Sequence, residues 1–98
     1  MYKIQLTESF QNDIEKILIY SIDTFGQSQA DKYYENLFLT IEKIARMPSI
    51  GHSRKDIPSY FRSYIYSQHS LLYIADDKNM TATFARVLHS HMDFTQKL

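Results

Sequence analysis

Cysteine is absent from this 98-residue sequence, and glycine and proline occur only twice each. The lack of cysteine excludes a disulfide framework and thiolate metal sites, and it is typical of proteins from a reducing compartment. By contrast, eight Tyr and six Phe are present, and 44% of the residues are hydrophobic. A chain so rich in large apolar side chains is expected to fold around a compact core instead of remaining disordered.

Segments that direct a protein to or across a membrane are also missing. The opening stretch, MYKIQLTESF, has neither the charged start nor the apolar run of a signal peptide. No window approaches the roughly 18 apolar residues of a membrane span. We therefore expect a soluble, cytoplasmic protein with one domain that covers residues 1–98 and no membrane contact.

A strong net charge is lacking too, because eleven Lys and Arg balance eleven Asp and Glu. The balance is uneven along the chain: residues 46–69 hold four Lys and Arg against one Asp, an excess of three positive charges. General nucleic-acid binding by counterion release needs more clustered cations than this. The basic segment therefore predicts a solvated loop, and we expect no direct sequence-specific binding of nucleic acid.

Two amphipathic helices are predicted in the first half of the chain. Residues 2–6, YKIQL, alternate as a short strand does, and Thr7 supplies an N-cap for a helix that begins directly after it. Gly26 is expected to end this helix, and Ser28 to begin a second one that stops before Pro48. Apolar residues spaced by three and four form one stripe on each helix. The stripes are Phe10, Ile14, Ile17, Leu18, Ile22 and Phe25 in the first helix, and Ala30, Tyr34, Leu37, Phe38, Ile41, Ile44 and Ala45 in the second.

Three consecutive strands are predicted in the second half. Residues 60–66, 69–75 and 80–88 are rich in β-branched and aromatic side chains and are separated by short polar turns. Residues 47–60, which hold both prolines, are expected to form a long surface loop. The predicted fold class is α+β, in the order β-α-α-β-β-β. An antiparallel helical hairpin packs on one face of a mostly antiparallel four-stranded sheet, and a C-terminal tail or short helix follows.

The segment RVLHSHMD, residues 86–93, places His89, His91 and Asp93 at alternate positions, a spacing that suggests a metal site. It resembles the HxHxD start of the metallo-β-lactamase type of site, in which a further His follows the Asp directly. Phe94 stands at that position here. A mononuclear zinc site needs three converging ligands, so we expect neither a metal site nor a cofactor.

A metal-independent ribonuclease site is an alternative use of the polar residues. Such a site needs guanidinium groups to hold a phosphodiester and a histidine to move a proton. If the alternating faces of the strands coincide, Arg62 and Arg86 stand with His69 or His89 on the side of the sheet away from the helices. The other interpretation is that both arginines pair with carboxylates and stack on tyrosines.

The succession of motifs resembles the ParE toxins of the RelE/ParE superfamily. The stretch FGQSQADKYYENLFLTIEKIARMPSIGHSRKDI is similar to the family's second helix and the segment after it, and RVLHSHMD is similar to its closing motif. The match extends over nearly the whole chain, and it is specific through the order and spacing of its parts. The residues that carry it are Gly26, Gln29, Ala30, Met47, Pro48, Gly51, Arg54, Asp56, Ile57, Arg62, His69, Tyr73, Arg86, His89, Met92 and Asp93.

The resemblance implies a toxin of a type II toxin–antitoxin pair, which stops growth, serves plasmid stabilization or chromosomal maintenance, and is neutralised by a ParD-like antitoxin in a hetero-oligomer. ParE toxins of known activity act on DNA gyrase, whereas RelE-like relatives cut messenger RNA in the ribosome. This chain departs from the ribosome-dependent pattern, because it is not basic overall and has no Tyr after Tyr73. Gyrase inhibition without catalysis is therefore the favoured hypothesis. The alternatives are an RNase that uses Arg62, Arg86 and His89, and a degenerate, non-toxic member that acts only in operon regulation.

Two partner sites follow from these hypotheses. Contacts with gyrase are expected at the end of the chain, on His89, Met92, Asp93 and Phe94.

The antitoxin site is predicted from two apolar residues that break their helical patterns. Ile19 points about 140° away from the centre of its stripe, and Leu39 about 170°, so both are expected to be exposed in the free monomer. A disordered antitoxin segment would fold there as an amphipathic helix. Its acidic residues would be anchored by Arg54, Lys55 and Arg62 of the basic loop.

Overall fold

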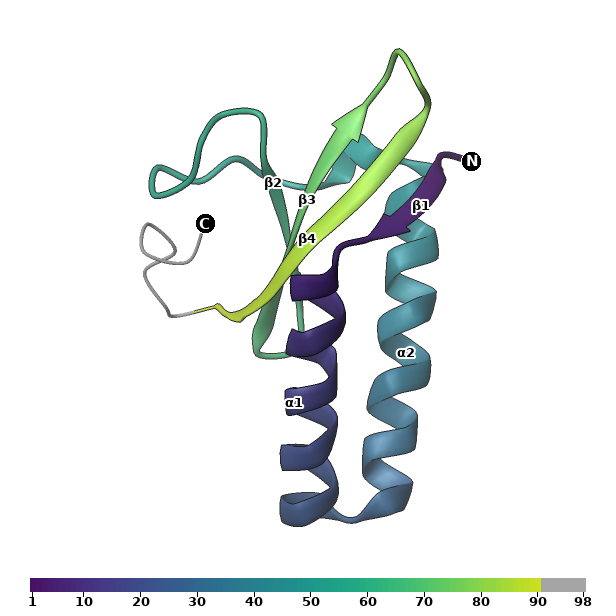
Figure 1. Ribbon diagram of the computed structural model, residues 1–98, viewed down its shortest axis with the longest axis vertical. Coiled ribbons are helices and arrows are strands. Elements are labelled where there is room, and N and C mark those ends of the chain that lie inside the picture. Colours follow the sequence, from purple (N-terminus) through teal and green to yellow (C-terminus); the bar gives the residue numbers. More distant parts are fainter. Residues whose placement is uncertain (91–98) are drawn as a thin grey trace.

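The computed structural model describes residues 1–90 as two layers, a helical hairpin and a sheet (Figure 1). The elements are β1 (Lys3–Leu6), α1 (Glu8–Phe25), α2 (Gln27–Arg46), the short 3-10 helix η1 (Pro48–Ile50), β2 (Arg62–Tyr66), β3 (His69–Asp76) and β4 (Thr81–His89). The predicted order β-α-α-β-β-β is confirmed. The sheet has the order β1-β4-β3-β2 and is mixed, because β1 runs parallel to β4 while the other neighbours are antiparallel.

The helix boundaries follow from capping chemistry. The Thr7 hydroxyl accepts a hydrogen bond from the Phe10 amide, as an N-cap does, and α1 begins at Glu8 as expected. Gly26 ends α1 and has a φ of 90°, a conformation that glycine adopts without strain. The predicted start of the second helix is wrong by one residue. Gly26 is also its N-cap, so α2 begins at Gln27 instead of Ser28.

The main core lies between the hairpin and one face of the sheet. Both helical stripes contribute to it: Phe10 and Ile14 from α1, and Leu37, Ile41 and Ile44 from α2, are buried there. They pack against residues of β3 and β4, with Tyr64 and Tyr66 of β2 at the margin. The stripes are exposed at the far end of the hairpin, which extends beyond the edge of the sheet (Figure 1). Ile22, Phe25 and Tyr34 are consequently exposed, although periodicity predicted them to be buried.

The opposite face of the sheet is covered by the segment between η1 and β2. Ile57 and Phe61 are buried there against Leu72 of β3 and Leu88 of β4. The prediction of a plain surface loop was therefore wrong for this segment, because its two large apolar side chains form a second, smaller core.

Gly51 lies where this segment leaves η1, directly against the buried Tyr73. The Gly51 amide donates a hydrogen bond of 2.9 Å to the Tyr73 hydroxyl, and that hydroxyl donates to the Pro48 carbonyl. A Cβ atom at position 51 would overlap the Tyr73 hydroxyl. Pro48, Gly51 and Tyr73, which are far apart in sequence, therefore form one structural unit.

Within residues 1–90, none of the helices combines the length and apolar character that a membrane span needs.

Candidate functional site

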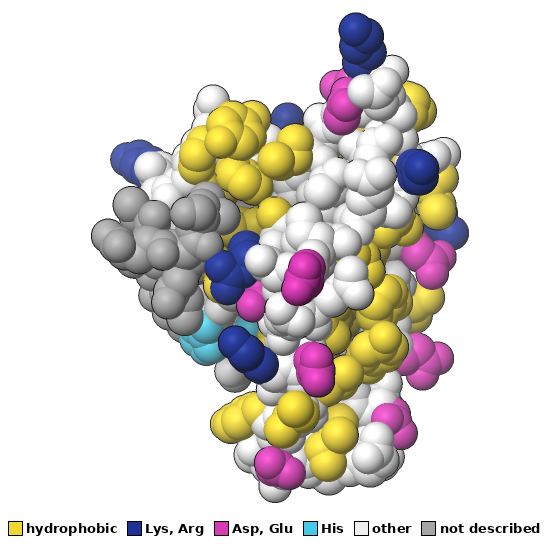
Figure 2. Space-filling view, in the orientation of Figure 1, with side chains coloured by type: hydrophobic (Ala, Val, Ile, Leu, Met, Phe, Trp, Pro, Cys, Tyr) yellow, Lys and Arg dark blue, Asp and Glu magenta, His cyan; other side chains and the backbone are white. Residues whose placement is uncertain are grey.

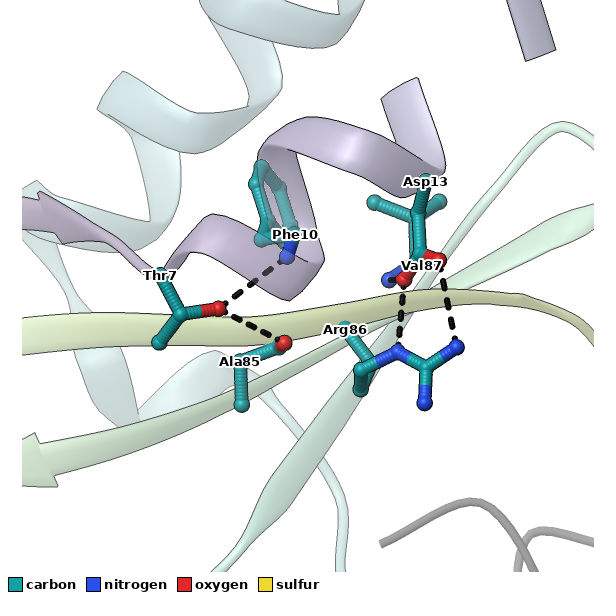
Figure 3. Close-up of polar contacts among 6 residues, drawn as sticks. All are labelled: Thr7, Phe10, Asp13, Ala85, Arg86 and Val87. Atoms are coloured by element: carbon teal, nitrogen blue, oxygen red, sulfur yellow. Dashed lines mark hydrogen bonds and ion pairs between the residues drawn. The ribbon is translucent and has the colours of Figure 1, made fainter. Parts of the chain in front are cut away.

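The central feature of β4 is an irregularity that α1 stabilises (Figure 3). Leu72 of β3 lies opposite Arg86, but the next residue, Tyr73, lies opposite Phe84, so that Ala85 is an extra residue in β4. Such a bulge leaves backbone groups without partners in the sheet. Thr7 and Asp13 supply the missing partners. The Thr7 hydroxyl donates to the Ala85 carbonyl at 2.9 Å, and the Val87 backbone amide donates to Asp13 Oδ2, also at 2.9 Å.

Arg86 is held by the same aspartate. Its Nε and Nη2 donate to Asp13 Oδ2 and Oδ1 at 2.7 and 3.1 Å, which is a two-pronged ion pair in a partly buried position. The pair raises the pKa of the Arg86 guanidinium further above its ordinary range. The expectation that Arg86 faces away from the helices is therefore wrong. Phe84 packs in the core beneath the helices, so this face of β4 is the helix side, and the Arg86 side chain reaches Asp13 of α1 (Figure 3).

Arg62 lies elsewhere on the molecule. Its Nη1 donates to the Gly51 carbonyl at 3.1 Å, and it lines a depression beside η1. Arg86 and His89 instead line a depression next to α1. In addition, Tyr64 and Tyr66 pack with the helix-side core, so that face of β2 is the helix side. The expected meeting of Arg62, Arg86 and a histidine on the open face of the sheet is not observed.

Two histidines and a tyrosine cluster at the end of the β3–β4 ladder. His69 lies directly opposite His89, with ring centroids 5.8 Å apart. The Tyr33 hydroxyl of α2 lies 2.9 Å from His69 Nδ1. Burial lowers the pKa of His69 below its ordinary value, and His89 lowers it further. His69 is therefore neutral at pH 7.

A groove of about 540 Å³ opens beside this cluster. One wall comes from the end of the hairpin, with Ile17, Tyr20 and Phe25, and the other from the β2–β3 turn with both histidines. The groove joins the apolar tip of the hairpin to the end of β4, so one bound partner could contact both.

The outer surface of the hairpin is more apolar than expected. Ile19 and Leu39 are 54% and 58% exposed, so their predicted exposure is confirmed. Tyr20 and Phe25 are 63% and 64% exposed and lie edge to face with their rings 6.4 Å apart. Figure 2 shows hydrophobic side chains over the lower part of the hairpin with acidic side chains around them. Sequence reasoning missed the exposure of Phe25. Helical periodicity places Phe25 in the apolar stripe but does not show that the sheet ends before it.

The predicted basic anchors differ in how they are held. Arg54 forms a two-pronged ion pair with Asp56, with distances of 2.7 and 2.6 Å, and its Nη1 lies 3.5 Å from the Ser90 carbonyl. Lys55 and Arg62 are exposed. Arg54 therefore orders the loop, Arg62 is exposed but donates to the Gly51 carbonyl, and Lys55 is exposed to solvent.

The remaining predicted site residues, Met92, Asp93 and Phe94, lie outside the described residues, as does His91 of the HxHxD motif. Within the described part of the chain, no three His, Asp or Glu side chains come together as a metal-binding group.

Comparison with known structures defines the class of this fold. It superposes with a TM-score of 0.76 on a chain of the chromosomal ParDE toxin–antitoxin system of P. aeruginosa, at 14% identity, covering 91% of this chain and 96% of that one. It also superposes with a TM-score of 0.59 on a chain of the intact RelBE toxin–antitoxin complex of E. coli. The identity there is 13%, and the match covers 92% of this chain and 98% of that one. The fold is thus the one shared by the ParE and RelE toxins.

The sequence places the chain within that class. Residues 4–94 match the family model described as the ParE toxin of the type II toxin–antitoxin system parDE. The chain is also 30% identical over 93 residues to Toxin ParE1 of Mycobacterium tuberculosis, covering 95% of this chain and 94% of that protein. This chain belongs to the ParE family of type II toxins.

Proposed function

We propose that this toxin acts in the cytoplasm by inhibiting DNA gyrase, without catalysing a reaction, and that a ParD-like antitoxin neutralises it. Membership of the ParE family supports this target over the ribosome. The observation that carries the proposal is the ion pair between Arg86 and Asp13, which occupies the guanidinium that a nuclease would need.

The chemistry of RNA cleavage explains why this pair matters. A metal-independent nuclease needs a cation that stabilises charge on the phosphodiester and a group that moves a proton, both within reach of one scissile bond. In this toxin Arg86 is bound by a carboxylate, and Arg62 lines a different depression from His89. This arrangement favours a protein that acts by binding.

Controlled expression distinguishes the three hypotheses. The chain is expressed with and without the open reading frame beside it that encodes the proposed antitoxin, and the purified protein is assayed for gyrase supercoiling and for cleavage of translated messages. We expect growth arrest that the antitoxin reverses, with supercoiling inhibited and messages intact. Message cleavage would instead support the RNase alternative, and the absence of both effects would support a non-toxic member.

The antitoxin is proposed to cover the outer surface of the hairpin around Ile19 and Leu39. Both aliphatic side chains are exposed, as are Tyr20, Ile22, Phe25 and Tyr34 of the same hairpin. Burying them under an amphipathic helix of the antitoxin would contribute about 2–5 kcal/mol before ordering costs. That free energy corresponds to several factors of ten in affinity. Lys55 and Arg62 are exposed and would attract acidic residues of the same antitoxin.

The double variant Ile19→Asp with Leu39→Asp tests this surface. We expect it to abolish antitoxin binding in titration calorimetry while circular dichroism shows an unchanged fold, because exposed positions tolerate polar side chains. The matched control is Asn12→Asp with Asn36→Asp, which adds the same charge at exposed polar positions of the same helices. Equal affinities for the two double variants would place the antitoxin elsewhere, on the open edge or face of the sheet.

The gyrase contacts are proposed to lie on His89 and on three residues outside the described part of the chain, Met92, Asp93 and Phe94. Removal of residues 94–98 is expected to lower toxicity while antitoxin binding persists, because this segment would contact the target and contribute little to the fold. Colony counts after induction measure toxicity, and calorimetry measures antitoxin binding. A truncated protein as toxic as the full chain would rule out this assignment.

A further inference from the structure

His69 and His89 are placed as two ligands of one ion would be. They form the last residue pair of the β3–β4 ladder, and their rings approach edge to face with centroids 5.8 Å apart. Side chains at directly opposite positions of antiparallel strands leave from Cβ atoms about 5 Å apart, on the same face of the sheet. A metal–imidazole nitrogen bond is about 2.1 Å long. This separation is compatible with two imidazoles that share a single ion.

Tyr33 prepares His69 for this role. Its hydroxyl is within hydrogen-bond distance of His69 Nδ1, at 2.9 Å. The tautomer in which Nδ1 donates to this oxygen keeps the lone pair of Nε2 available, and metal-binding histidines are commonly oriented by such a partner. The Tyr33 ring is itself fixed against Tyr66, with centroids 4.9 Å apart, and burial raises the pKa of its hydroxyl. His69 is thus held in one position.

We propose that His69 and His89 form a two-histidine site for a borderline divalent metal ion, with Ni²⁺ and Cu²⁺ as the chemical candidates. Imidazole nitrogens suit these ions, whereas Mg²⁺ and Ca²⁺ prefer oxygen. The site opens into the groove beside the hairpin, from which an ion can reach it. Its effect is to link β3 to β4 at the end of their ladder. This site differs from the HxHxD motif, of which it uses one residue.

The charges around the pair set its affinity. Lys16 of α1 lines the same depressions as both histidines and repels a bound cation. Arg86 lines one of them as well, with its charge balanced by Asp13. Lys16 is therefore the group that weakens the site, and replacing it by a carboxylate would supply both an attractive charge and a third ligand.

Titration calorimetry of the full-length chain with NiCl₂ and with CuCl₂, in a buffer that does not bind metal, tests the proposal. We expect one ion per chain and a rise in the thermal midpoint with the metal. His69→Ala and His89→Ala should each lower the affinity roughly ten-fold or more, whereas His52→Ala, which removes an exposed histidine of the loop, should leave it unchanged. Circular dichroism without metal shows whether each variant is folded. Equal affinities for the wild type, His69→Ala and His89→Ala would overturn the proposal.

Two further variants separate ligation from a general effect on stability. Tyr33→Phe removes the hydroxyl beside His69 and keeps the ring, so we expect roughly a ten-fold loss of affinity with little change in the metal-free protein. Lys16→Glu should strengthen binding by about ten-fold or more. A gain of this kind cannot arise from misfolding. Weaker binding by Lys16→Glu, or unchanged binding by Tyr33→Phe, would contradict the assigned geometry.

Discussion

His69 is the residue at which burial and charge meet in this toxin. Its side chain lies between Tyr33 of α2 and His89 of β4. Burial lowers its pKa first, and the neighbouring His89 lowers it further. The folded chain thus binds a proton at this position less readily than the unfolded chain, whose histidine titrates near pH 6.5.

This difference predicts a pH dependence of stability. Well above pH 6.5, His69 is neutral in both the folded and the unfolded chain and contributes nothing to the pH dependence of stability. As the pH falls through about 6.5, the unfolded chain takes up the proton first, so the free energy of unfolding decreases until the lower pKa of the folded state is passed. Urea unfolding between pH 7.5 and pH 5 should show a shallower decrease in the free energy of unfolding for His69→Gln than for wild type. Identical profiles for the wild type and His69→Gln would contradict this account.

Residue-level prediction from the sequence succeeded where regular periodicity applied. The exposure of Ile19 and Leu39 followed from the 100° step of a helix, and it is observed. The position of Arg86 did not follow from the two-residue period of a strand, because that period does not say which face meets the helices, and the bulge at Ala85 interrupts it. The alternative that Arg86 pairs with a carboxylate is the one found, but no sequence pattern identified Asp13 as its partner.

At the scale of elements, the start of α1 stabilises the bulge of β4 as well as its own first turn. One hydroxyl, that of Thr7, accepts from the Phe10 amide at 3.0 Å and donates to the Ala85 carbonyl at 2.9 Å. The Thr7 amide in turn donates to the Phe84 carbonyl at 3.1 Å. The end of β1, the start of α1 and the middle of β4 are therefore joined at a single residue.

Thr7→Ala should consequently cost more than the loss of a helix cap. A cap contributes typically about 1 kcal/mol, and the loss of the bond to a partly buried carbonyl adds about 1 kcal/mol, so the free energy of unfolding should fall by about 2 kcal/mol. Thr7→Ser keeps the hydroxyl and should lose much less than half of this. Urea unfolding of the three proteins measures both values, and equal destabilisation by Ser and Ala would show that the hydroxyl is not responsible.

Most elements could be predicted from the sequence because their signals are local. Thr7, Gly26 and Pro48 mark helix ends through their own backbone and side-chain chemistry, and the two-residue alternation indicated the strands. The segment before β2 could not be predicted in this way. This segment covers the sheet only because Ile57 and Phe61 pack against Leu72 and Leu88, which are distant in sequence. The parallel pairing of β1 with β4 is also a long-range contact, so it could not be predicted from local signals either.

At the scale of the whole molecule, the groove and the two histidines lie at the end where the hairpin extends beyond the sheet. The hairpin extends beyond the sheet, and the groove beside it connects its exposed aromatic tip to the histidines at the end of β4 (Figure 1). In the proposed function, the antitoxin covers the outer hairpin and gyrase is contacted from the end of β4 onward. The ion pair of Arg86 with Asp13 is the feature that separates this account from RNA cleavage.

The most direct test of non-catalytic gyrase inhibition is a stoichiometric titration. Purified gyrase at a fixed concentration is mixed with increasing amounts of the purified toxin, and supercoiling of relaxed plasmid DNA is measured. The account predicts that inhibition is complete near equal amounts of toxin and gyrase, that cleaved DNA accumulates, and that translated messages stay intact under the same conditions. Unimpaired supercoiling at a large excess of toxin, together with message cleavage by toxin present far below the ribosome concentration, would contradict it.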